Sequence, residues 1–138
     1  MTTSAATGSV SETFARVLEE KKRAFIPFIC AGDPNLDATK KALKVLDDAG
    51  ADIIELGVPY SDPLADGPVI QASATRALAN GATLNKVIDL VREVSPTIAA
   101  PIVMFTYYNP IYQRGVDAFC RDIACLLYTS DAADDDRS

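Results

Sequence analysis

The sequence has 138 residues, 49% of them hydrophobic, which is enough for one domain with a sizeable core. Its formal net charge of -6 argues against a general nucleic-acid binder, because phosphate contacts need a surplus of Lys and Arg. No apolar run approaches the roughly 20 residues that a membrane-spanning helix needs, so we expect no contact with a membrane or with nucleic acid.

The first part of the sequence predicts a helix, a strand and a second helix. Residues 9–23 place apolar side chains at helical spacing on a charged background. The continuous apolar run 24–30 has the length of a buried strand. A turn at residues 31–34 leads into a helix over residues 36–49, which Gly50 ends.

The middle of the sequence predicts one more strand and two more helices. Residues 52–57 are again continuously apolar, as expected for a parallel strand that is covered on both faces. Pro68 suits the first turn of a helix that ends near residues 80–81. Thr83 caps the next helix, which Pro96 ends.

The last part predicts a third strand over residues 98–105, a loop over 107–110 and a helix over 115–124. Strands that alternate with helix-sized stretches indicate an α/β fold with parallel strands, either an open doubly wound sheet or a (β/α)8 barrel. No G-x-G-x-x-G motif follows the first strand, which lowers the dinucleotide-binding option.

Two residue types, histidine and cysteine, limit which catalytic groups and metal sites the chain can have. The sequence contains no histidine, which excludes Ser-His-Asp and Cys-His nucleophiles and histidine-based zinc sites. Carboxylates and tyrosines are left as proton carriers. Its three cysteines are not at metal-ligand spacing, so we interpret them as reduced thiols and expect no metal.

The stretch 53–68 carries the candidate chemistry. It runs from the second predicted strand into a Pro- and Gly-rich loop, with Glu55 among apolar residues near the strand end and Asp62 and Asp66 in the loop. This layout is typical of an acid/base site at the end of a barrel strand. The alternatives are a buried Glu55 with a structural partner, and an Asp66 that caps a helix or forms a turn beside Gly67.

These residues give the sequence a resemblance to the α subunit of tryptophan synthase. The strings that carry it are residues 25–28, 31–34, 55–71 and 105–111. The resemblance covers about residues 9–124 and implies the first three βα units of a (β/α)8 barrel, roughly 120 of about 250 residues. We therefore assign residues 1–124 to the N-terminal part of such a barrel. We expect residues 125–138 to be a tail that is foreign to the family or disordered.

The resemblance implies a lyase of tryptophan biosynthesis. The family cleaves indole-3-glycerol phosphate to indole and glyceraldehyde 3-phosphate by a retro-aldol reaction, in which two carboxylates handle the protons. By resemblance Glu55 acts as acid/base toward the ring carbon and the glycerol hydroxyl, and Asp66 contacts the indole N-H. The family's phosphate-binding groups follow later barrel strands that this sequence does not contain.

The resemblance also assigns binding and interface residues. Phe28, Phe105 and Tyr107 match positions that line the indole pocket, although Phe105 fits a barrel core equally well. Pro59, Asp62 and Asn109 match positions near the β subunit, with turn formation as the alternative for each.

The implied assembly is an α2β2 tetramer in a bacterial cytoplasm or a plastid stroma. No cofactor is expected in this chain, because pyridoxal phosphate belongs to the β subunit. Two other functions stay open from the sequence: a stand-alone indole-3-glycerol-phosphate lyase, and a module without catalytic activity that binds the β subunit through residues 59–66. The 138-residue chain by itself is expected to be inactive.

Overall fold

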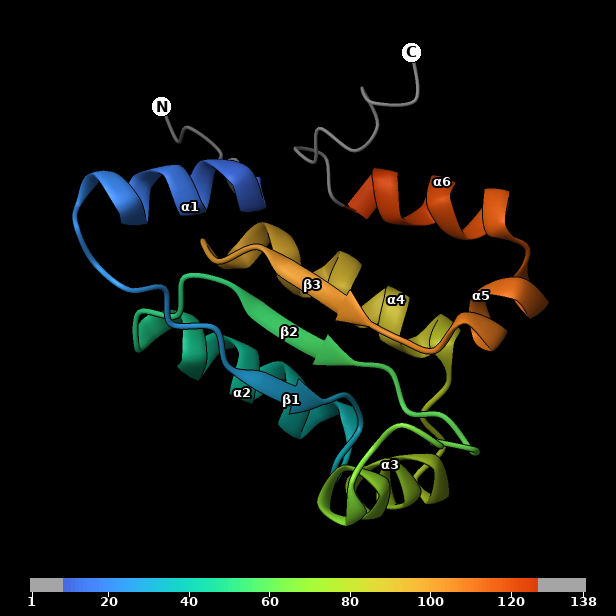
Figure 1. Cartoon of the computed structure of the whole chain (residues 1–138). Coiled ribbons are helices and arrows are strands. Elements are labelled where there is room, and N and C mark those ends of the chain that lie inside the picture. The colour runs from blue at the N-terminus through green and yellow to red at the C-terminus, as the bar shows by residue number, and fades with distance from the viewer. Residues whose placement is uncertain (1–8, 127–138) are drawn as a thin grey trace.

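The computed structural model describes residues 9–126, which form three parallel strands and six α-helices (Figure 1). The strands are β1 (Phe28–Cys30), β2 (Ile54–Gly57) and β3 (Ile102–Phe105). The α-helices are α1 (Val10–Glu19), α2 (Leu36–Asp48), α3 (Pro68–Ala79), α4 (Leu84–Val94), α5 (Tyr108–Arg114) and α6 (Val116–Leu126), and a 3-10 turn, η1, covers Ser95–Thr97. None of the helices in this part of the chain is long and apolar enough to cross a membrane.

The helices begin where local capping chemistry predicts. Ser9 accepts a hydrogen bond from the Glu12 backbone N–H, and the Glu12 side chain accepts one in return, which completes a capping box before α1. Thr83 caps α4 by accepting from the Lys86 backbone N–H, and Pro68 occupies the first turn of α3. The predicted bounds of α3 and α4 are therefore confirmed.

The strands are shorter than the apolar runs that predict them. In place of a strand over residues 98–105, β3 begins at Ile102. The backbone N–H groups of Ala99 and Ala100 donate to the Asp47 carboxylate, and Pro101 has no N–H to offer a neighbouring strand. A buried segment can therefore be apolar throughout without forming a strand.

Helix α5 replaces the loop predicted for residues 107–110. Pro110 is the third residue of this helix, where its missing N–H and fixed φ cost nothing because the first turn has no intrahelical acceptors. The prediction of a loop was wrong because Asn-Pro is more common in turns. Residues 127–138, most of the predicted tail, lie outside the described residues, and a division of the chain at residue 124 stays a prediction.

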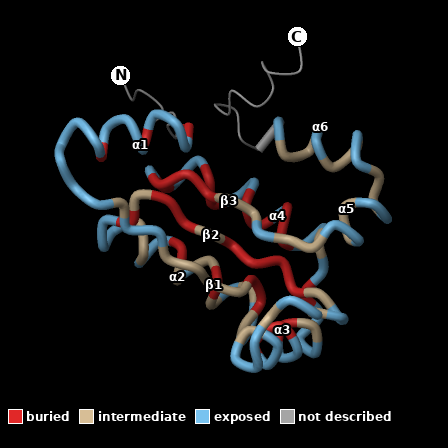
Figure 2. The backbone as a smooth tube through the Cα atoms, viewed as in Figure 1, coloured by how far each residue is buried: buried red, intermediate tan, exposed pale blue. Residues whose placement is uncertain are grey.

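The sheet has the order β1-β2-β3, with all pairs parallel. Side chains alternate between its two faces. One face packs against α2 and α4, where Ile54, Leu56 and Ile102 are buried together with Leu43 and Ile88. Figure 2 shows β2 as the buried centre of the molecule. The helix-covered face is therefore the hydrophobic core of the described chain.

Candidate active site

The other face of the sheet carries the predicted site residues. In the strand register Phe28 lies opposite Glu55, which lies opposite Val103, and Gly57 lies opposite Phe105. Paired residues in neighbouring strands share a face, so these side chains project away from the helix-covered core. The Phe28 and Phe105 rings meet edge to face with centroids 6.0 Å apart.

A small pocket lies at the C-terminal edge of the sheet. Its free volume is about 20 Å³, and it is bounded by strand ends, the β2–α3 loop and α3. The residues that line it are Phe28, Cys30, Gly57, Val58, Pro59, Tyr60, Asp66, Ile70, Ala74, Phe105 and Tyr107. The structure therefore brings together Asp66 and the three aromatic residues that the sequence predicts for substrate binding.

Glu55 shares the sheet face with this pocket but does not line it. It is two residues before Gly57 on β2, a spacing of about 6.6 Å along a strand. Its side chain is partly exposed, and its backbone N–H donates to the Pro27 carbonyl oxygen at 2.9 Å. Glu55 and Asp66 are thus placed at two depths on the same side of the sheet.

The Asp66 loop between β2 and α3 is tied to the end of β3. The Ala65 backbone N–H donates to the Tyr107 hydroxyl at 3.0 Å. The Tyr107 ring packs against the Tyr60 ring with centroids 5.2 Å apart, and the Asn109 side-chain amide donates to the Tyr60 hydroxyl at 2.8 Å. Tyr107 therefore has a structural role in addition to the predicted one in substrate binding.

The residues predicted to face a partner differ in exposure. Asp62 and Asn109 are exposed, whereas Pro59 is buried and lines the pocket. Leu64, which the sequence did not single out, is 85% exposed in the same loop. An exposed leucine next to an exposed carboxylate gives the loop a mixed apolar and charged surface, which is common in protein interfaces.

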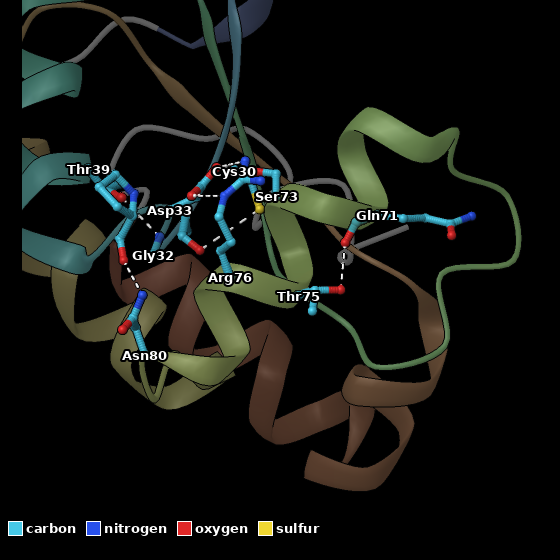
Figure 3. Close-up of polar contacts among 11 residues, drawn as sticks. Cys30, Gly32, Asp33, Thr39, Gln71, Ser73, Thr75, Arg76 and Asn80 are labelled. Atoms are coloured by element: carbon cyan, nitrogen blue, oxygen red, sulfur yellow. Dashed lines mark hydrogen bonds and ion pairs between the residues drawn. The ribbon is translucent and has the colours of Figure 1, made fainter.

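A charged cluster lies beside the pocket, between the β1–α2 loop and α3 (Figure 3). Arg76 of α3 donates through Nε and Nη2 to the two Asp33 oxygens, both at 2.9 Å, and the Ser73 hydroxyl donates to Asp33 Oδ2 at 2.5 Å. The Arg76 guanidinium and then the Ser73 hydroxyl hold the pKa of Asp33 at about 2. Asp33 is therefore ionised and fully partnered, which indicates a structural role.

Cys30 lines the pocket next to this cluster. Burial raises the pKa of its thiol, although a hydrogen bond with Ser73 opposes that effect. A raised pKa disfavours the thiolate, which is the nucleophilic form of cysteine. Within residues 9–126 no group of three or more His, Cys, Asp or Glu side chains is placed to hold a metal ion.

The sequence pattern gives no sign that Tyr60, Gln71, Ser73 and Arg76 belong to this region. Their partners are 49, 5, 40 and 43 residues away in the chain, respectively. Only Gln71, five residues from Asp66, is close enough in the chain for a local pattern to indicate the contact. The other contacts depend on how the parallel strands align.

The sequence model of the tryptophan synthase alpha chain family matches residues 14–126. The tryptophan synthase alpha chain of Rippkaea orientalis is 62% identical over 115 residues, which cover 83% of this chain and 43% of that protein. The alpha chain of Arabidopsis thaliana is 58% identical over 117 residues, or 85% of this chain and 42% of that protein.

Solved structures give the same result. The crystal structure of tryptophan synthase subunit alpha from Legionella pneumophila has a TM-score of 0.81 at 37% identity, covering 84% of this chain and 45% of that one. Tryptophan synthase from M. tuberculosis in its aminoacrylate-bound form has a TM-score of 0.81 at 35% identity, covering 86% and 48%. The described residues are thus part of a (β/α)8 barrel, and the chain spans less than half of the curated relatives.

Proposed function

The chain belongs to the tryptophan synthase alpha chain family, and on that premise we propose that it provides the first βα units of a carbon-carbon lyase. The proposed reaction is retro-aldol cleavage of indole-3-glycerol phosphate to indole and glyceraldehyde 3-phosphate. The observation that supports it is the pocket that Phe28, Phe105 and Tyr107 line together with Asp66. Aromatic side chains and one hydrogen-bond acceptor are the chemistry that a flat heteroaromatic ring with a single N–H donor requires. The 20 Å³ of free volume here is too small for the ring itself, so the remaining βα units of the barrel are proposed to complete its pocket.

The two carboxylates are proposed to divide the proton transfers. Asp66 accepts the indole N–H and stabilises the positive charge that develops when the ring carbon is protonated. Glu55 delivers that proton and takes one from the glycerol hydroxyl, while the electron pair of the broken C–C bond stays with the indole. A ligand that extends from the pocket along β2 would meet Asp66 in the pocket and Glu55 further toward the start of the strand.

We propose the β subunit of tryptophan synthase as the protein partner, in an α2β2 assembly. The exposed Asp62, Leu64 and Asn109 at the C-terminal edge of the sheet support a docking surface there. The chain itself is proposed to need no cofactor. Since the relatives include bacterial proteins and one from Arabidopsis, we propose a bacterial cytoplasm or a plastid stroma as its location.

The test joins residues 1–124 of this chain to the C-terminal part of the Rippkaea orientalis alpha chain, which completes the barrel. We expect the chimera to release indole from indole-3-glycerol phosphate, whereas the 138-residue chain alone releases none, because a barrel active site draws on several βα loops. Glu55→Gln should lower kcat of the chimera by about 100-fold or more. The intact Rippkaea orientalis chain serves as the control for the assay.

Two results would contradict this proposal. A chimera with Glu55→Gln that keeps the activity of its parent would remove Glu55 from the reaction. A folded chimera without activity, beside an active control, would favour the alternative of a binding module. In that case the 138-residue chain should still bind β subunit in a pull-down.

The second enzymatic alternative is a stand-alone lyase. Adding β subunit to the chimera distinguishes it, because a stand-alone enzyme would show no activation. Strong activation by the β subunit would support the tetramer.

A further inference from the structure

The β2–α3 loop that carries Asp66 is held from outside at three backbone groups. The Ala65 N–H donates to the Tyr107 hydroxyl at 3.0 Å. The side-chain amide of Gln71 donates to the Asp66 carbonyl oxygen at 2.7 Å and approaches the Pro63 carbonyl oxygen at 3.5 Å. Gln71 therefore contacts the backbone of the proposed catalytic residue itself.

We propose that Gln71 is a positioning residue, which holds the Asp66 carboxylate in the pocket by binding the Asp66 carbonyl oxygen. This proposal rests on the proposed function of Asp66. Gln71 does not line the pocket and its side chain binds the Asp66 backbone, so we assign it an action through Asp66. Because the peptide plane is rigid, fixing the carbonyl also restricts the direction in which the Asp66 side chain leaves the backbone.

Helix α3 gives Gln71 a fixed base. Arg76 and Ser73, further along the helix, bind Asp33 of the β1–α2 loop. Figure 3 shows the Gln71 side chain pointing away from this cluster, on the other side of the helix. One side of α3 is thus anchored to the fold while Gln71 reaches the loop, which is the arrangement expected of a group that keeps a catalytic side chain in place.

The alternative is that Gln71 only ties the β2–α3 loop to the start of α3 through the Asp66 carbonyl oxygen, and so contributes to stability alone. A purely stabilising role would change the melting temperature and leave the kinetics of a folded enzyme unaltered. A positioning role would lower kcat, because Asp66 acts in the chemical step.

The experiment uses the chimeric barrel described above, with Gln71→Met as the variant. Methionine keeps the length of glutamine and removes the donor. We expect kcat to fall about 3- to 10-fold with little change in KM, the effect that one neutral hydrogen bond can have on a rate. Gln71→Glu, which replaces the donor with a second acceptor, should lower kcat at least as far. The matched control is Gln113→Met, at the only other glutamine of the sequence, on the exposed surface of α5.

A double-mutant cycle separates positioning from stability. In an Asp66→Asn background Gln71→Met should cause no further loss of kcat, because the group that it positions is already inactive. Equal and independent losses in the two backgrounds would overturn the proposal. So would an unchanged kcat in Gln71→Met, whatever happens to its melting temperature.

The same cycle distinguishes failure of the positioning role from failure of the proposed function. If Asp66→Asn alone leaves kcat unchanged, the proposed function of Asp66 is wrong and the positioning role is overturned with it. If Asp66→Asn lowers kcat while Gln71→Met does not, only the positioning role is wrong.

Discussion

The two faces of the three-stranded sheet differ in what covers them, although their residues alternate along the same strands. On one face Ile54, Leu56 and Ile102 are at most 2% exposed beneath α2 and α4. On the other face Glu55 is partly exposed and Phe105 is 56% exposed. A shift of one residue along β2 therefore separates a position that stabilises the fold from one that is available to a ligand.

The largest effect on stability should come from Leu56→Ala. Leu56 is completely buried in the core, so its truncation should lower the free energy of unfolding by about 2 to 5 kcal/mol. Glu55→Gln, its neighbour on the opposite face, keeps the side-chain volume and should change it by less than about 0.5 kcal/mol. Urea unfolding of the 138-residue chain, followed by circular dichroism, measures both.

This pair of variants directly tests the difference between the two faces of the sheet. If Glu55→Gln destabilised the chain as much as Leu56→Ala, the face that carries Glu55 would belong to the core, and the alternative of a buried structural glutamate would be favoured. If neither variant altered the midpoint, the described sheet would not be the cooperative core of the chain.

The next effect in size should come from Gly57→Ala, because Phe28 occupies the space above that glycine. A Cβ at Gly57 would lie 2.6 Å from the Phe28 Cζ atom, which is too close for the ring to stay in place. We expect a loss of about 1 to 3 kcal/mol in the free energy of unfolding, the usual cost of overpacking. In a Phe28→Leu background the loss should shrink, and equal losses in both backgrounds would show that ring displacement is not the cause.

Local signals in the sequence placed the starts of α3 and α4 better than the ends of the strands, although they missed α5. Thr83 and Pro68 mark helix starts through hydrogen bonds and dihedral angles that involve only a few neighbouring residues. The start of β3 depends instead on Asp47, which binds the backbone of Ala99 and Ala100 from more than 50 residues away. Long-range capture of backbone donors leaves no local pattern, so the strand bounds were too wide.

The residues of the candidate site, like the bounds of the strands, were only partly predictable from the sequence. The stretch around Glu55 and Asp66 indicated acid/base chemistry because carboxylates are unusual at the end of an apolar strand. The contact between Ala65 and Tyr107, 42 residues apart, and the Asp33–Arg76 ion pair require the strand register. That information comes from packing, and the resemblance to a known family supplied only part of it.

The smallest effect on the free energy of unfolding should come from Asp33→Asn. This variant tests whether a charged side chain near the pocket must belong to the reactive site. Because Arg76 and Ser73 hold the pKa of Asp33 at about 2, below its ordinary 3.8, the ionised form stabilises the folded state. This contribution is fully present above pH 3.8 and is lost as the pH falls through about 2. It should be modest and weaken in salt, because the Arg76 side chain is 57% exposed.

Acid titration of the 138-residue chain and of its Asp33→Asn variant checks this prediction. The difference in unfolding free energy between them should be constant above pH 4 and shrink toward pH 2, since protonation removes the charge from the parent chain only. A difference that did not depend on pH would assign the effect to packing.

In the chimeric barrel Asp33→Asn should leave kcat far less changed than Glu55→Gln does, because the Asp33 carboxylate binds α3 and a ligand in the pocket would meet Asp66. An equal loss of activity would show that the β1–α2 loop, and not only the exposed face of the sheet, takes part in the reaction.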